Sequence, residues 1–564
     1  MNLTITNFLR LFYSLWAKIY LASRRANVVE LEISGELIEH KIGINLFQKY
    51  LGKAPAAFGD LIFALEQAET DPRIKACLAK ISSNSLGWGR ASELREAIHR
   101  FRACGKKVFA FLEESGNLEY FIATACDEII LPPSQSLDLI GLLTEVIYFK
   151  GVLDKLEIKP EFLQVGKYKS AAEPFTRDSM SEEHREALNA ILDDIFHELI
   201  QAISQGRNLP SEKVKPLIDQ GPYLPEEALE QKLVDRLMYS DQMEEYLESG
   251  IGAPVNKINA EIYYRLRANS RIGMSLLKRA PRLALIYATG VIEAGDRDDY
   301  QGLDENINAE QMLKTLRALR ENPRIKAAVL RIDSPGGNAV SSDLIWREVK
   351  LLSQAKPLIV SMADTAASGG YYLAMPGEKI LAQPGTITGS IGVLAGKINL
   401  RGLYHKIGLN KEQLKRGEDA DLFSDYTDLT GTRKAKLTKE IEHFYRLFVE
   451  KAAEARKMTR EEMDQKAQGR VWTGKQAMEI GLIDGIGGLR KALDLAKQTI
   501  GLLPQERALI EIHPRPRRKF FPAFRFRLPT LPFSDEKESR LIAAFARLAR
   551  EKILLIMPFL VRIK

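Results

Sequence analysis

The sequence predicts an α/β protein made by tandem duplication of one domain, with mostly parallel sheets. The segments "DPRIKACLAKIS" (71–82) and "NPRIKAAVLRID" (322–333) are identical at 6 of 12 positions. The same offset of 251 residues pairs Tyr120 with Tyr371, Gly141 with Gly392, Lys155 with Lys406 and Gly166 with Gly417. A period of this length indicates two complete domains and not the short units of a solenoid.

The second observation is an alternation of short apolar runs with helical patterns inside each copy. In the second copy, residues 283–292, 327–333 and 357–363 are apolar and rich in β-forming residues, whereas 308–322 and 342–355 have helical spacing. Short buried strands separated by helices predict a mostly parallel sheet. In such a sheet the loops that follow the strands carry the functional groups.

These patterns divide the chain into five parts. We expect a first repeat over residues 27–250, an irregular basic linker over 251–281 and a second repeat over 282–500. An amphipathic segment (1–26) precedes the first repeat, and a basic amphipathic tail (501–564) follows the second.

The charge is unevenly distributed along the chain. The net charge of +7 includes +4 in residues 1–26 and +9 in residues 513–564, which leaves −6 for the body. An acidic body argues against a nucleic-acid partner, and basic ends favour an anionic surface such as membrane lipid.

Both ends also have amphipathic spacing without an uninterrupted apolar run of 18 residues. The N-terminal apolar face comprises Phe8, Leu11, Phe12, Leu15, Trp16 and Ile19, opposite Arg10, Ser14 and Lys18. The C-terminal stripe comprises Leu541, Ile542, Phe545 and Leu548 beside Arg540, Arg547 and Arg550, followed by "ILLIMPFLV". We expect both segments to lie in a membrane interface, with packing on the protein body as the alternative.

Three cysteines, Cys77, Cys104 and Cys126, occur without CxxC spacing. Neither a zinc site nor a disulfide framework is expected. No other pattern indicates a metal or a cofactor.

Two loops after predicted strands have the composition of a nucleophilic site. The segment "DSPGG" (333–337) leaves glycine amides uncovered before a helix, and such amides can bind a negative oxygen. In "TAASGGYY" (365–372), Ser368 stands at a strand-to-helix turn, where its hydroxyl would be exposed to a substrate. The amides of Gly337 and Gly369 could then form an oxyanion hole. Each motif alone would also fit a simple tight turn.

The segments "DSPGG", "AASGGYYLAM" and "TGSIGV" together resemble signal peptide peptidase A (protease IV) in its long, duplicated form, a family of the Clp protease/crotonase superfamily. The resemblance covers about residues 28–500 and implies a tandem Clp/crotonase-like fold. It further implies a serine nucleophile, a lysine base from the other repeat, and a serine in "TGS" that bonds the lysine amine.

The repeat comparison selects the same residues. Ser368 corresponds to Asn117 and Ser390 to Leu139, whereas Lys169 of "YKSA" corresponds to Ala420. The first copy lacks the two serines and the second copy lacks the lysine, which favours one site assembled from both copies. The interpretation assigns Ser368 as nucleophile, Lys169 as base and Ser390 as the residue that holds the amine.

A lysine acts as a base only when it is neutral, and burial among small apolar residues lowers its pKa. Lys167, two residues away, is the competing candidate. A histidine base of the Clp type is not expected, because residues 385–397 contain no histidine and His405 fits a surface position.

The resemblance implies a membrane-associated serine endopeptidase that degrades hydrophobic peptides such as cleaved signal peptides. It also implies a bacterial-type inner membrane or an equivalent, no metal or cofactor, and a homo-oligomer that is a tetramer in long family members. Relatives usually carry an N-terminal membrane span, whereas Arg10 and Lys18 interrupt residues 8–22 here. An inactive peptide-binding membrane scaffold and a crotonase-like acyl-CoA enzyme are the alternatives.

Overall fold

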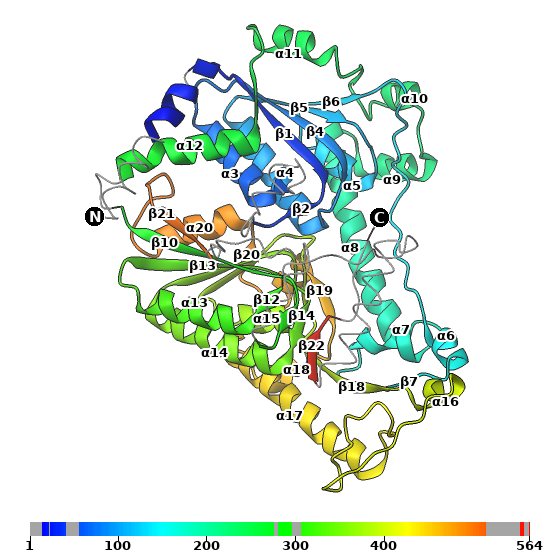
Figure 1. Cartoon of the computed structure of the whole chain (residues 1–564). Helices are drawn as coiled ribbons and strands as arrows, with labels where there is room; N and C mark the ends of the chain where they lie inside the picture. Colours follow the sequence, from blue (N-terminus) through cyan, green and yellow to red (C-terminus); the bar gives the residue numbers. More distant parts are fainter. Residues whose placement is uncertain are drawn as a thin grey trace.

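The computed structural model describes residues 14–21, 23–40, 56–275, 280–295, 306–514, 553–557 and 563. It confirms the predicted α/β class and the tandem arrangement. Figure 1 shows the sheet of the first repeat above that of the second, with the long helix α8 (Glu182–Arg207) running along one side of both.

The sheet of the first repeat is parallel throughout its described strands. Their order is β8-β6-β5-β4-β1-β9. The bounds are β1 Val28–Gly35, β4 Ala76–Asn84, β5 Lys107–Leu112, β6 Glu128–Leu131, β8 Arg236–Leu237 and β9 Lys257–Asn259, with a separate pair β2 Leu37–Ile38 and β3 Ala56–Ala57. The apolar runs of these strands are buried under helices, as a parallel sheet requires.

The sheet of the second repeat has the order β19-β17-β15-β13-β10-β21, with β16 and β20 beside β15. Only the β17–β19 pair is antiparallel among its described pairs. The bounds are β10 Arg282–Thr289, β13 Ile325–Ser334, β15 Leu358–Ala367, β16 Lys379–Ala382, β17 Ile387–Gly389, β19 Val471–Thr473, β20 Gly485–Ile486 and β21 Leu509–His513. The three strands expected here from the sequence are therefore present as β10, β13 and β15.

A third sheet joins the two repeats and is largely antiparallel. Its order is β12-β11-β14-β22-β18-β7. The bounds are β7 Lys159–Val165, β11 Ile292–Glu293, β12 Ile307–Asn308, β14 Gly336–Asn338, β18 Val393–Asn399 and β22 Ile553–Ile556. Strand β7 of the first repeat pairs with β18 of the second over seven residues, from Val165–Val393 to Lys159–Asn399.

Helices pack on the faces of these sheets. In the first repeat they are α3 Phe58–Glu69, α4 Trp88–Ala103, α5 Asn117–Ala123, α6 Lys150–Lys155, α7 Glu173–Thr176, α8, α9 Ser211–Gln220, α10 Pro225–Glu230, α11 Met243–Ile251 and α12 Ala260–Ser275. In the second they are α13 Ala309–Glu321, α14 Ala339–Ala355, α15 Gly369–Ala374, α16 Arg401–Lys406, α17 Gly431–Arg456, α18 Arg460–Lys466, α19 Gly474–Glu479 and α20 Leu489–Gln498. The offset of 251 residues relates α6 to α16 at both ends, so it applies to the structure as well as to the sequence.

Two parts differ from the sequence expectation. The segment 251–281 is largely regular, because β9 extends the first sheet and α12 packs against α3. Strand β22 lies in the segment 540–561 that we expected at a membrane, yet it is buried between β14 and β18. The correction applies to residues 553–557, since most of that tail lies outside the described residues.

The N-terminal segment is described from Ser14. Residues 14–21 are helical, with Ser14, Ala17 and Leu21 buried and with Leu15 and Ile19 58% and 61% exposed. The Ser14 hydroxyl donates a hydrogen bond to the Ser270 carbonyl of α12. One side of this helix therefore packs on the body, while Leu15 and Ile19 on the other side remain exposed. Among the described helices, none has both the length and the apolarity needed to cross a bilayer.

Candidate active site

Ser368 occupies the sharp turn between β15 and α15. Its backbone angles are φ 54° and ψ −113°, a region that is costly for any residue other than glycine. The turn is held because the Ser368 amide donates to the Gly389 carbonyl at 2.7 Å. A Cβ at Gly369 would lie 2.8 Å from the Ser342 Oγ, so the residue after the serine has no room for a side chain. Strand β15 and its neighbours thus fix the serine hydroxyl in place.

Lys169 reaches Ser368 from the other repeat through the β7–β18 pairing. Its Nζ lies 2.8 Å from the Ser368 Oγ, 2.9 Å from the Ser390 Oγ and 3.1 Å from the Ser390 carbonyl oxygen. All three side chains are fully buried. The structure therefore brings together the serine, the lysine and the second serine that the sequence singled out.

The lysine stem lies in a channel formed by glycines. A Cβ on Gly469 would lie 2.7 Å from the Lys169 Cβ, and a Cβ on Gly392 would lie 3.0 Å from the Lys169 Cδ. The backbone at Gly392 and Gly469 can therefore lie this close to the Lys169 side chain only because neither residue has a side chain. Sequence reasoning missed both positions as site residues, although Gly392 stands in the quoted "TGSIGV".

The electrostatic surroundings favour a neutral amine. Burial holds the pKa of Lys169 well below its usual 10.5. A neutral amine has one lone pair and two N–H groups, which matches the three oxygens around it. The Ser368 hydroxyl can then donate to the Lys169 nitrogen, while the two N–H groups donate to Ser390. The arrangement is suited to removing the proton from the serine.

The glycine loop lies next to the serine turn. A Cβ built on Gly336, where φ is +100°, would lie 2.7 Å from the Gly369 nitrogen. The neighbouring Gly337 instead approaches Ile292 of β11 and pairs with Leu555 of β22. Gly336 is therefore the loop residue that approaches Gly369 most closely, a distinction that two adjacent glycines do not reveal in the sequence.

The residues weighed as alternatives lie elsewhere. Lys167 is exposed, with its amine over the Tyr168 ring at 4.8 Å. His405 is exposed in α16 and hydrogen-bonds the Tyr426 hydroxyl. Asn117, the counterpart of Ser368, is buried and binds the Ile140 and Gly141 backbone. None of the three contacts Lys169 or Ser368.

Strand β22 lies directly beside the glycine loop. It pairs antiparallel with β14, where Gly336 faces Ile556, and with β18, where Leu394 faces Leu554. The Met557 amide donates to the Pro335 carbonyl at 2.7 Å. An extended apolar segment of this chain thus fills the space between the glycine loop and β18.

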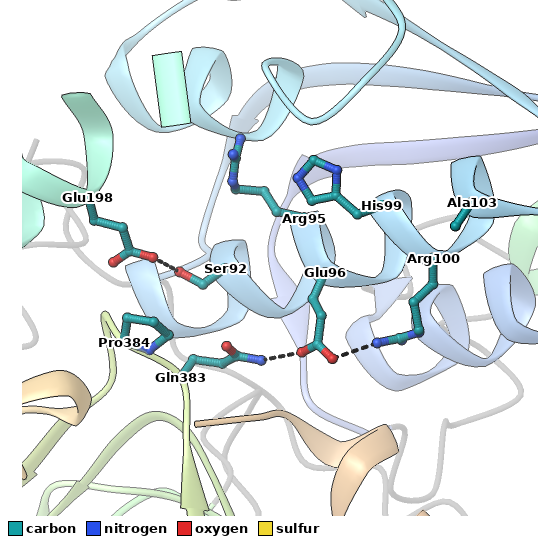
Figure 2. Close-up of a pocket in the computed structure, with 9 residues that line it drawn as sticks. All are labelled: Ser92, Arg95, Glu96, His99, Arg100, Ala103, Glu198, Gln383 and Pro384. Atoms are coloured by element: carbon teal, nitrogen blue, oxygen red, sulfur yellow. Dashed lines mark hydrogen bonds and ion pairs between the residues drawn. The ribbon is translucent and has the colours of Figure 1, made fainter. Parts of the chain in front are cut away.

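A separate pocket lies at the seam between the repeats (Figure 2). Its volume is about 420 Å³. Its lining residues are Ser92, Arg95, Glu96, His99, Arg100, Ala103 and Glu198 from the first repeat, with Gln383 and Pro384 from the second. Neither Ser368 nor Lys169 lines this pocket, so it is distinct from the serine site.

Comparisons with known proteins show which family the chain resembles. The family model of peptidase family S49 matches residues 100–253 and 350–503, once in each repeat. The chloroplastic serine protease SPPA of Arabidopsis thaliana is 36% identical, over 90% of this chain and 74% of that protein. Protease 4 of Salmonella typhi is 32% identical over 83% and 78%, and protease 4 of Haemophilus influenzae is 30% identical over 78% and 72%. A ClpP1 mutant from Listeria monocytogenes has a TM-score of 0.25 and 16% identity, over 39% of this chain and 99% of that one.

The S49 family model and the SPPA and protease 4 relatives place the chain among the serine peptidases. The chain belongs to peptidase family S49, and the resemblance to signal peptide peptidase A in its long, duplicated form is confirmed.

Proposed function

We propose that the protein is a serine endopeptidase with a Ser–Lys dyad assembled from both repeats. The observation that carries the proposal is the 2.8 Å contact between the buried Lys169 amine and the Ser368 hydroxyl. Lys169 removes the hydroxyl proton as Ser368 Oγ attacks the peptide carbonyl, and it then returns that proton to the leaving amine. The acyl-enzyme ester is hydrolysed by a water that Lys169 deprotonates in the same way.

Ser390 and the glycine amides complete the site. Ser390 accepts both N–H groups of the neutral lysine, which aims the lone pair at Ser368. The amide of Gly369 and an amide of the glycine loop stabilise the negative oxygen of the tetrahedral intermediate. Gly337 is the loop residue expected from the sequence, and it remains the candidate because the Gly336 amide already donates to the Ser334 Oγ at 3.2 Å.

Hydrophobic peptides are the proposed substrates, and the strand position between β14 and β18 is their proposed binding cleft. Strand β22, with the sequence "ILLI", lies between β14 and β18 as an antiparallel strand. A substrate in the same place would gain backbone hydrogen bonds from both strands and apolar contacts for its side chains. Peptides left in a membrane after signal cleavage have this chemistry.

Membrane association is proposed from the N-terminal segment. Leu15, Trp16 and Ile19 form an exposed apolar face on the described helix, and Lys18 is exposed beside them. A surface of this kind favours the interface of an anionic membrane. A bacterial-type inner membrane or its equivalent fits the protease 4 relatives.

Homo-oligomerisation is proposed from two unpaired segments. At the offset of 251 residues, 142–148 correspond to β18 and 410–416 correspond to β7, yet neither segment pairs with any described strand. Leu143 is 56% exposed where its counterpart Leu394 is fully buried, and Leu414 is 98% exposed where Leu163 is partly buried. A second copy could pair its 410–416 with 142–148 of the first and bury both, head to tail. Head-to-tail pairing of this kind can close into a ring, and the family resemblance implies a ring of four copies.

The test uses a hydrophobic peptide ester and a fluorophosphonate probe. We expect wild-type protein to hydrolyse the ester and to be labelled at Ser368, and Ser368→Ala to do neither. A folded wild type without turnover or labelling would favour the inactive scaffold. Turnover that survives Ser368→Ala, with binding of CoA, would favour the crotonase-like enzyme.

A further inference from the structure

Helix α4 of the first repeat receives its N-terminal cap from the second repeat. Its N-cap position is Gly87, which has no side chain to offer. The Asp364 carboxylate from β15 takes that place, because it accepts the Gly87 amide at 2.8 Å and the Arg90 amide at 2.6 Å. The Arg90 guanidinium forms an ion pair with the same carboxylate.

The second repeat shows the arrangement that α4 has lost. Helix α14 is the counterpart of α4, and its own Asn338 caps it by accepting the Ser341 amide at 2.8 Å. At the offset of 251 residues, Asn338 corresponds to Gly87 and Ser341 to Arg90. The first repeat has therefore replaced an internal cap with a carboxylate from its partner repeat.

Two glycines make the close approach possible. A Cβ on Gly87 would lie 2.5 Å from the Asp364 Cγ, and a Cβ on Gly89 would lie 2.6 Å from the Ala363 carbonyl oxygen. Side chains at either position would push β15 away from α4. The local sequence "GWGR" (87–90) is thus fitted to the carboxyl-terminal part of β15.

This contact lies next to the nucleophile. Asp364 is four residues before Ser368 on β15, whose turn has the costly backbone angles described above. The amide of Thr365 donates to the Asp333 carboxylate at 2.9 Å, and Asp333 opens the glycine loop "DSPGG". Arg90 is itself fixed by hydrogen bonds to the Leu37 and Ser85 carbonyls of the first repeat.

We propose that Asp364 is a positioning residue for Ser368, and that the loop before α4 in the first repeat is the clamp that holds it. The segment "SSNSL" (82–86) of the first repeat corresponds to the glycine loop "DSPGG" of the second and leads into this clamp. In the first repeat this segment therefore supports the site of the second repeat. The proposal rests on the proposed function, since positioning has meaning only if Ser368 is the nucleophile. Asp364 acts through the backbone of β15 and does not contact the reacting atoms.

The test separates positioning from simple capping. Asp364→Ala removes both roles, whereas Gly87→Asn with Asp364→Ala gives α4 an internal cap of the type that α14 has. The Asp364 carboxyl atoms are the nearest obstacles to a Cβ at position 87, so the double variant has room for its asparagine. Glu66→Gln is the matched control, because it breaks an ion pair of Glu66 with Arg490 that joins the repeats at another place.

We expect Asp364→Ala to lower kcat for the peptide ester about 10²-fold with KM changed less than about twofold, and to slow fluorophosphonate labelling of Ser368 in parallel. The double variant should recover the part of the thermal midpoint that the helix cap contributes, although not the part from the Arg90 ion pair, and should keep the low kcat, whereas Glu66→Gln should keep wild-type kcat. Recovery of kcat together with the thermal midpoint in the double variant would overturn the proposal, as would wild-type kcat in Asp364→Ala. If Asp364→Ala does not fold, the double variant alone decides between these outcomes. Failure of the proposed function would appear separately, as turnover that survives Ser368→Ala.

Discussion

The amine of Lys169 lies 2.8 Å from the hydroxyl of Ser368, although 199 residues separate the two in the chain. Each residue belongs to a different repeat, and each repeat lacks the counterpart of the residue it receives. The β7–β18 pairing brings the lysine to the serine, so the proposed chemistry depends on contacts between the two halves of the chain.

Replacement of the proposed base should abolish turnover. We expect Lys169→Ala to lower kcat for the peptide ester by about 10³-fold or more, because a general base contributes about 10²–10⁴-fold. Lys167→Ala is the matched control two residues away, and its exposed amine predicts activity within about twofold of wild type. A dead Lys167→Ala beside an active Lys169→Ala would contradict the assignment.

The buried lysine should also make the stability of the fold depend on pH. Because burial lowers the pKa of Lys169 in the folded state, the unfolded state binds the extra proton between that pKa and about 10.4. This lysine therefore destabilises the fold as the pH falls from about 10 toward neutrality. Lys169→Met removes the effect, so its thermal midpoint relative to wild type should be highest near pH 7 and should fall toward pH 10. Thermal unfolding across this range measures the trend, with exposed Lys167→Met as control, and a difference that does not vary with pH would contradict it.

Loss of the second serine should weaken the base without removing it. We expect Ser390→Ala to reduce kcat by about 10- to 100-fold, since the lysine amine loses one of its two acceptors and its orientation is less fixed. KM should stay close to wild type, because Ser390 contacts the Lys169 amine and is not proposed to contact the substrate. Steady-state kinetics on the peptide ester check this, and an unchanged kcat would remove Ser390 from the site.

Deletion of residues 551–564 tests the place of β22. If β22 occupies the peptide cleft, its removal should raise kcat/KM for a hydrophobic peptide, because substrate no longer competes with a covalently attached strand. A synthetic peptide with the sequence of residues 551–560 should then inhibit the shortened protein competitively. Loss of activity on deletion would show instead that β22 is needed to support the glycine loop.

A charged residue at the proposed interface should dissociate the oligomer. Leu414→Asp places a carboxylate on the most exposed of the large apolar residues described, so we expect a smaller mass by light scattering with an unchanged thermal midpoint of the monomer. Leu503→Asp, on another exposed leucine, is the control and should leave the mass unchanged. A monomeric wild type, or equal effects of both variants, would exclude the interface.

The sequence alone was sufficient to predict the fold class, the duplication and the candidate site residues. These rest on local signals, namely the alternation of apolar and helical patterns and motifs such as "AASGGYY" whose residue types are few and specific. Comparing the two copies added the assignment of Lys169, because a residue retained in one copy and lost in the other stands out without any knowledge of contacts. The described secondary structure in this part of the second repeat, residues 282–295 and 306–367, follows the predicted ranges closely for the same reason.

How distant segments meet is established only by the three-dimensional packing. Whether Gly336 or Gly337 contacts Gly369 depends on the register of β14 against its neighbours, which adjacent glycines do not encode. The apolar segment at β22 has the composition of a membrane-contact sequence, and its burial between β14 and β18 depends on edges supplied by residues more than 150 positions away. The cap that Asp364 gives to α4 has no sequence signal at all, because Gly87 and Asp364 become partners only when the two repeats pack together. Contacts between such distant segments depend on burial and hydrogen bonding in the assembled fold, and local sequence propensity does not predict them.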